Sequence, residues 1–195
     1  MTAPLLDPAT ALVVIDLQRG IVGAPTVPNP IEDVIARNVE LTTAFRARRL
    51  PVVLVRVSFA ADGGDVPPGR TAGPSRGGAL PADFDVLIDE LDVQPTDIIV
   101  TKRNWGAFYG TDLDLQLRRR GVTGIVLTGV ATTYGVESTA RSAHEHGYHV
   151  VVATDAIADR TAEGHEHAVT RIFPALGRTA TTSEILAGLP ATVDA

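Results

Sequence analysis

Ala-Leu-Val-Val-Ile-Asp-Leu at residues 11–17 sets the pattern that predicts the fold, because it is the first of several short apolar runs rich in β-branched residues. Similar runs follow at 51–57, 97–102, 123–129 and 148–154, with a weaker one at 178–182. Such runs are typical of strands buried on both faces. Segments of helical length and period lie between them, at 31–49, 111–120, 133–146 and 164–175. The alternation predicts an α/β fold with three layers, in which a mostly parallel sheet of five to six strands lies between helices.

The composition is that of an ordinary globular protein. The 195 residues are 45% hydrophobic and 21% charged, which predicts one domain over residues 1–195. A net charge of -6 argues against a nucleic-acid partner. No apolar run approaches the roughly 20 residues of a membrane span, and the N-terminus lacks a signal pattern, so we expect no membrane partner and a cytoplasmic location. The absence of cysteine excludes disulfides, thiolate metal sites and cysteine nucleophiles.

Two charged side chains end apolar runs. Asp16 follows Val13-Val14-Ile15, and Lys102 follows Ile98-Ile99-Val100-Thr101. Ligands of open parallel sheets bind beyond the carboxyl ends of the strands. Burying either charge without a partner would be costly, so we expect the carboxylate and the ammonium to meet at one edge of the sheet. The pair either belongs to a functional site or is an ion pair that only closes the core.

The segment after the 123–129 run reads as a tight turn from a strand into a helix. Its residues are Val130-Ala131-Thr132-Thr133-Tyr134-Gly135. Backbone N–H groups at such a helix start favour an anion or a developing negative charge, and this turn would direct them into the same cleft. The small residues Gly135, Ser138, Thr139 and Ala140 also permit close helix packing, which is a competing explanation for their presence.

Together these motifs resemble the isochorismatase-like superfamily, also called the cysteine hydrolases. The resemblance rests on the order of Val-Ile-Asp-Leu-Gln at 14–18, Thr-Lys at 101–102, Thr-Gly-Val-Ala-Thr at 128–132 and Val-Glu-Ser-Thr-Ala-Arg at 136–141. It extends over nearly the whole chain, including Asp155-Ala156, expected just after the fifth strand. It implies that Asp16 is an acid/base, that Lys102 is its charge partner, and that the amides of Ala131 and Gly135 form an oxyanion hole. It also implies a cis peptide between Val130 and Ala131 and a homo-oligomer, a dimer or larger.

Gly135 stands where the family pattern has its nucleophilic cysteine. Amidases of the family, such as nicotinamidases, use that thiolate to form a covalent acyl intermediate, which a glycine cannot do. Some isochorismatases of the family also lack the cysteine, because cleavage of a vinyl ether needs an acid but no nucleophilic side chain. The resemblance therefore implies hydrolysis of isochorismate or a related vinyl ether by Asp16 without a cofactor. The hydroxyls of Thr132, Thr133 and Ser138 are poor substitutes, since no histidine base lies near them in the sequence.

Two other interpretations stay open. In the first, the chain is a catalytically inactive homologue that binds a small molecule or regulates a partner. In the second, it is an amidase whose cysteine has been replaced by Gly135. The sequence does not separate these from the vinyl ether hydrolase.

Candidate substrate-binding residues lie in two regions. Arg70 and Arg76 belong to the glycine- and proline-rich stretch 60–81, which is either a functional lid or a mobile segment, and they could bind a carboxylate substrate. Gln18, Trp105, Phe108 and Tyr109 could line the pocket, although the aromatic residues also suit packing or a subunit contact.

Metal binding is not expected. The pairs His144/His146 and His165/His167 are two residues apart on helices, so their side chains point about 200° apart. We interpret all five histidines as surface or helix-end residues. On helix 31–49 we likewise expect Asn38 and Glu40 on the solvent side.

Overall fold

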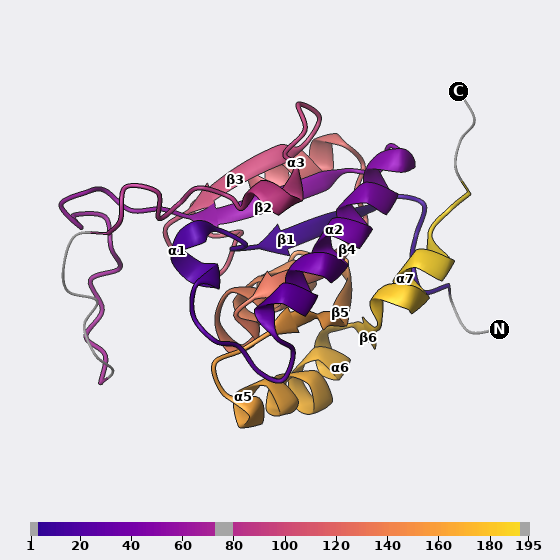
Figure 1. Cartoon of the computed structure of the whole chain (residues 1–195). Coiled ribbons are helices and arrows are strands. Elements are labelled where there is room, and N and C mark those ends of the chain that lie inside the picture. The colour runs from indigo at the N-terminus through magenta and orange to yellow at the C-terminus, as the bar shows by residue number, and fades with distance from the viewer. Residues whose placement is uncertain (1–3, 73–79, 192–195) are drawn as a thin grey trace.

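The computed structural model describes residues 4–72 and 80–191, and these form three layers (Figure 1). A parallel sheet lies between two layers of helices, in the strand order β3-β2-β1-β4-β5-β6. Its strands are β1 (Thr10–Ile15), β2 (Val52–Val57), β3 (Ile98–Lys102), β4 (Gly124–Val130), β5 (His149–Ala158) and β6 (Arg178–Ala180). The predicted parallel α/β fold is confirmed.

Alternate residues of the strands point to opposite faces and form two cores. On β1, Ala11, Val13 and Ile15 belong to one core, and Leu12 and Val14 belong to the other. The first core is covered by α3 (Leu113–Arg119), α4 (Glu137–Glu145) and α6 (Phe173–Leu176). The second is covered by α2 (Ile31–Ala47), the short helix η1 (Asp89–Leu91) and α7 (Thr182–Gly188). This burial on both faces explains the continuous apolar runs.

Strand order reverses between β1 and β4, which lie side by side in the middle of the sheet. In an open α/β sheet the crevice at the carboxyl ends of such strands is the usual ligand site. The two strands approach closely there: Gly129 has φ 101°, and a Cβ on it would lie 2.1 Å from the carbonyl oxygen of Ile15. The chain leaves β1 at Asp16 and β4 at Ala131, so both residues lie at this crevice.

The structure differs from the predicted elements in several places. Strand β5 continues to Ala158, past a register shift opposite Leu127 and Gly129, so Asp155 and Ala156 lie within the strand rather than after it. The predicted helix 133–146 begins with a π-helical turn, η2 (Thr132–Val136). The predicted helix 164–175 consists of α5 (Ala162–His167), a second π-turn, η3 (Ala168–Ile172), and α6. Helices α1 (Arg19–Val22), η1 and α7 were not predicted. Across the described residues, no helix has the length and apolar character to cross a membrane.

Candidate active site

The structure brings the two strand-end charges together. The Nζ atom of Lys102, at the end of β3, lies 2.7 Å from Oδ2 of Asp16, which follows β1. Both residues are almost completely buried, with 2% of Lys102 and 6% of Asp16 exposed. Asp16 has φ 53°, in the left-handed region that aspartate tolerates better than most residues. A buried ion pair, with its carboxylate on a residue of positive φ, therefore lies at the crevice between β1 and β4.

Lys102 is surrounded by hydrogen-bond acceptors. Besides the Asp16 carboxylate, the ammonium donates to the carbonyl oxygens of Trp105 at 2.8 Å and Asn104 at 3.2 Å. An ammonium has three N–H donors, and these three acceptors account for all of them. The loop after β3 therefore wraps around the cation and holds it against the carboxylate.

The η2 turn lies above this pair. The Val130–Ala131 peptide that leads into the turn is cis, as the resemblance implied. Gly135 is buried, and a Cβ built on it would lie 3.3 Å from Oδ2 of Asp16 and 2.7 Å from Cγ2 of Ile15. A side chain at position 135 would thus point at the Asp16 carboxylate, and the Ile15 methyl would have to shift to make room. The structure brings Asp16, Lys102 and Gly135 to one place, while their roles and the oxyanion role of the Ala131 and Gly135 amides stay predictions.

Gln18 is fully buried and bonded to the protein itself. Its amide nitrogen donates to the carbonyl oxygens of Val57 at 2.9 Å and Phe84 at 2.7 Å, and its oxygen accepts from the Val57 amide at 2.8 Å. Both amide hydrogens are therefore used. This geometry gives Gln18 the task of tying the end of β1 to β2 and to the 80–88 segment, and it leaves no donor for a substrate.

The aromatic residues after Lys102 divide into two groups. Trp105 is 61% exposed and Tyr109 is 79% exposed, so both remain candidates for contact with a substrate. The Trp105 ring meets the ring of Tyr134 edge to face, with centroids 4.9 Å apart. Tyr134 directly precedes Gly135 and was not singled out from the sequence. Phe108, in contrast, is buried and stacks on His146, so it is a packing residue rather than a pocket residue.

Arg70 and Arg76 are the two loop arginines that were predicted to bind a substrate, and no contact between described residues links Arg70 to the Asp16–Lys102 pair. Arg70 lies in the stretch 60–72, which is exposed throughout and projects away from the sheet (Figure 1). None of the ion pairs between described residues includes Arg70. Arg76 lies outside the described residues. The base of the stretch is anchored by Asp65, which accepts from the Arg103 guanidinium at 2.6 Å and from the Ala60 amide.

One histidine was interpreted wrongly. His165, on α5, is only 5% exposed, and its Nδ1 lies 3.0 Å from the hydroxyl oxygen of Thr132 in the η2 turn. Burial lowers the pKa of His165 from its usual 6.5, against the opposing charges of Asp159 and Glu166. The neutral ring and the Thr132 hydroxyl therefore share a hydrogen bond near neutral pH. Thr132 is itself fully buried, which argues against its use as a nucleophile.

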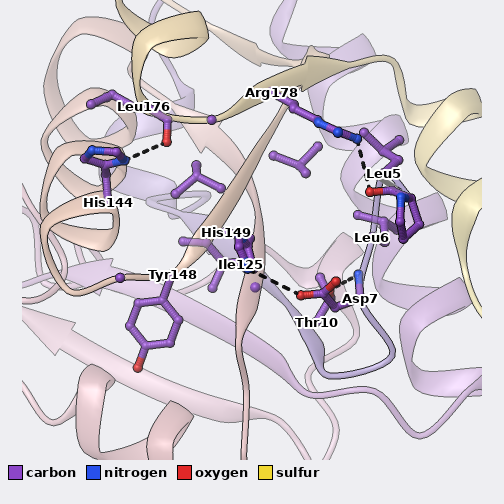
Figure 2. A pocket seen from close by; sticks show the side chains of 16 residues that line it. Leu5, Leu6, Asp7, Thr10, Ile125, His144, Tyr148, His149, Leu176 and Arg178 are labelled. Atoms are coloured by element: carbon purple, nitrogen blue, oxygen red, sulfur yellow. Dashed lines mark hydrogen bonds and ion pairs between the residues drawn. The ribbon is translucent and has the colours of Figure 1, made fainter. Parts of the chain in front are cut away.

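A cavity lies at the other end of the sheet from the ion pair, and Figure 2 shows its lining side chains. It has a volume of about 510 Å³ and is lined by the first residues of four strands: Thr10, Gly124, His149 and Arg178. Its polar side chains already have partners within the chain. His144 contacts the Leu176 carbonyl, and Arg178 donates to the Pro4 carbonyl (Figure 2). These contacts tie the N-terminal segment to the sheet, so the cavity offers no convergent set of polar groups for catalysis.

A smaller cavity of about 210 Å³ lies beside residues 58–61, which follow β2. Neither cavity is lined by Asp16, Lys102 or Gly135. The ion pair is almost fully buried. Within the described part of the chain, no group of three or more histidine, aspartate or glutamate side chains is placed to hold a metal ion.

A buried carboxylate and ammonium thus lie beside a backbone turn at the carboxyl ends of the strands of a parallel α/β sheet, where such sheets usually bind ligands. The sequence pattern of the isochorismatase domain matches residues 10–184. The isochorismatase family protein YecD of Escherichia coli O157:H7 is 44% identical over 180 residues, which cover 92% of this chain and 96% of YecD. The chain therefore belongs to the isochorismatase family and is a hydrolase of that family.

Solved structures agree with this assignment. An isochorismatase family protein from Burkholderia thailandensis superimposes with a TM-score of 0.92 at 49% identity, covering 96% of this chain and 99% of the other. The N-carbamoylsarcosine amidase of Thermoplasma acidophilum superimposes with a TM-score of 0.70 at 29% identity, covering 89% and 96%. The chain is thus similar both to isochorismatase family proteins and to an amidase of the same fold.

Proposed function

We propose that this hydrolase cleaves isochorismate or a related vinyl ether by acid catalysis from Asp16, without a covalent intermediate. The observation that carries the proposal is the combination of a carboxylate held by Lys102 at 2.7 Å with a glycine at the adjacent turn position. Position 135 has no side chain next to Asp16, and a shift of the Ile15 methyl, which lies 2.7 Å from where a Cβ would be, would admit a substrate or a water molecule beside the carboxylate. A reaction that needs an acid and water, but no nucleophilic side chain, fits this arrangement.

The reaction would proceed in two steps. The Asp16 carboxyl proton is transferred to the terminal carbon of the vinyl ether, which becomes a methyl group while the ether carbon becomes an oxocarbenium ion. Water adds to that carbon, and the resulting hemiketal breaks its bond to the ring oxygen to give pyruvate and a ring alcohol. The proton lost by the added water restores the Asp16 carboxyl group, so the cycle consumes one water and no cofactor.

Lys102 and the surroundings of Asp16 act in opposite directions on the proton of Asp16. The Lys102 ammonium favours the ionised form of Asp16, and thus stabilises the carboxylate that remains after the proton has been transferred. The protonated form is favoured by burial and by the carboxylates of a bound substrate. Substrate binding is therefore the event that loads the acid, and a substrate without a carboxylate would be a poor one.

The similarity to N-carbamoylsarcosine amidase supports a second candidate, hydrolysis of an amide. With Gly135 at the turn, an acyl-enzyme cannot form there, so water would have to attack the amide directly with Asp16 as the base. Binding without turnover is the third candidate, because the ion pair would persist in a protein that has lost its reaction.

Product analysis separates these candidates. The wild type is incubated in D₂O with isochorismate, and separately with N-carbamoylsarcosine and nicotinamide, while pyruvate and ammonia are measured. Acid catalysis predicts pyruvate with one deuterium in its methyl group, because the new C–H bond takes its hydrogen from an exchangeable carboxyl. Pyruvate without the label would refute Asp16 as the proton donor and indicate a hydrogen transfer within the substrate. Ammonia without pyruvate would favour the amidase.

The replaced-cysteine interpretation has its own test. Gly135→Cys introduces a Cβ 2.7 Å from the Ile15 methyl, so it is compared with Gly135→Cys combined with Ile15→Leu, which moves the branch away from that position. Ammonia release from either variant would support a parent amidase. Folded variants that release none would argue against it.

A further inference from the structure

Side chains that follow β5 make several hydrogen bonds to the η2 turn. The turn carries Gly135 above Asp16, so its position determines where the Gly135 amide lies relative to the carboxylate. Within and next to the turn, the amides of Tyr134 and Val136 both donate to the Ala131 carbonyl, and the Glu137 amide contacts the carbonyls of Thr132 and Tyr134. Side chains from outside the turn bond to its first two residues as well.

Asp159 supplies the strongest of these contacts. It is 1% exposed, and its Oδ2 accepts from the Thr133 amide at 2.6 Å and from the Thr133 hydroxyl at 2.7 Å. Its Oδ1 accepts from the amides of Arg160 at 2.6 Å and Thr161 at 3.4 Å. A buried carboxylate is costly unless hydrogen bonded, and bonds to a charged acceptor are strong. This carboxylate directs two of its bonds to one residue of the turn.

His165 makes a hydrogen bond with Thr132, the residue before Thr133. Its Nδ1 lies 3.0 Å from the hydroxyl of Thr132, and both side chains are buried. Thr132 and Thr133, the first two residues of the turn, are thus each held by one side chain from the segment after β5. The Asp159 backbone is itself fixed, because it pairs with Val27 in an antiparallel bridge with two 2.8 Å hydrogen bonds.

The last residues of the turn contact α4 and the loop that follows β3. The Thr139 hydroxyl donates to the Gly135 carbonyl at 2.6 Å and accepts from the Ala107 amide at 3.1 Å. The Trp105 ring lies against Tyr134. Because Trp105 is the single tryptophan of the chain, its fluorescence reports on the position of the turn.

We propose that Asp159 and His165 are positioning residues that hold Thr133 and Thr132 and thereby fix the turn carrying Gly135 over the Asp16–Lys102 pair. This inference rests on the proposed function where it concerns turnover, but not where it concerns the position of the turn. Neither side chain needs to touch the substrate. Their loss displaces the backbone beside the reacting atoms, and small displacements of that kind lower the rate more than they weaken binding.

The chain offers a matched control. Asp155 accepts from the Thr182 amide at 2.7 Å and the Thr182 hydroxyl at 2.9 Å, the same pattern as Asp159 with Thr133, but at the start of α7. Asp159→Asn and Thr133→Val are therefore compared with Asp155→Asn and Thr182→Val. Urea unfolding, acrylamide quenching of Trp105, and kcat and KM for pyruvate release from isochorismate are measured for each. Thr133→Ser, which keeps the hydroxyl, serves as the rescue variant.

The positioning role predicts altered Trp105 quenching in Asp159→Asn and Thr133→Val but not in the two controls, with wild-type quenching in Thr133→Ser. It also predicts that kcat falls about 10- to 100-fold in Asp159→Asn while KM changes much less. Equal quenching in Asp159→Asn and Asp155→Asn, both folded, would overturn the inference. If Asp159→Asn does not fold, the pair Thr133→Val and Thr133→Ser decides in the same way. A wild type that releases no pyruvate would refute the proposed function, and the quenching comparison would still decide the position of the turn.

Discussion

Replacement of Lys102 by methionine probes the ion pair that dominates the site. Methionine fills a similar volume but removes the cation, so the Asp16 carboxylate stays buried without the charge that lies 2.7 Å away. The carbonyl oxygens of Asn104 and Trp105 lose their ammonium donor as well. Removing one partner of a buried ion pair costs about 3–5 kcal/mol. We therefore expect Lys102→Met to lower the free energy of unfolding by about that amount at pH 7.

Urea unfolding at constant protein concentration measures this loss, and a double-mutant cycle tests its cause. Asp16→Asn leaves the ammonium with an amide oxygen and two carbonyls, so we expect a smaller cost of about 1–3 kcal/mol. In the double variant no charge is stranded, and its cost should fall below the sum of the single costs by about 0.5–3 kcal/mol. Strictly additive losses, or a loss below about 1 kcal/mol for Lys102→Met, would show that no buried charge is left without its partner in the single variants.

Two further perturbations follow from local geometry. Gly129→Ala places a Cβ 2.1 Å from the Ile15 carbonyl oxygen at φ 101°, whereas Gly121→Ala at φ 66° meets nothing within 4 Å. Unfolding should therefore show a loss of about 1 kcal/mol for Gly121→Ala and well over twice that for Gly129→Ala, and similar losses would contradict the close approach of β4 to β1. Burial lowers the pKa of His165, so below about pH 6.5 the unfolded chain binds a proton that the folded chain does not. The free energy of unfolding then decreases as the pH falls from 6.5, by at most about 1.4 kcal/mol per pH unit, and His165→Gln should reduce that slope. An unchanged slope in the variant would show that His165 is not held in its neutral form.

The sheet and the ion pair could be predicted because their signals are local. Each strand is an uninterrupted apolar run, and Asp16 and Lys102 are charges placed directly after such runs. The parallel order then brings strand ends to one edge. Helix α7 was missed although its signal was present, since Thr181 and Glu184 form a capping box in the sequence.

Other features depend on contacts between distant segments. Asn38 was expected on the solvent side of α2, but it is fully buried, donates to the Ala156 carbonyl and accepts from the Thr128 hydroxyl. His165 was interpreted as a surface residue because nothing near it in the sequence indicates Thr132, which lies 33 positions away. The helical period cannot distinguish a π-turn from the first turn of an α-helix. Polar residues that the fold itself satisfies are therefore the ones that local patterns fail to place.

The role of Asp16 as the acid is tested directly by the rate of pyruvate release from isochorismate by the wild type and by Asp16→Asn. The carboxamide keeps the shape of the side chain and a partner for Lys102, but it has no acidic proton to give. We expect turnover by the wild type and a loss of about 10²- to 10⁴-fold in the variant, the range of a general acid. Comparable rates from a folded Asp16→Asn protein would contradict acid catalysis by this carboxylate.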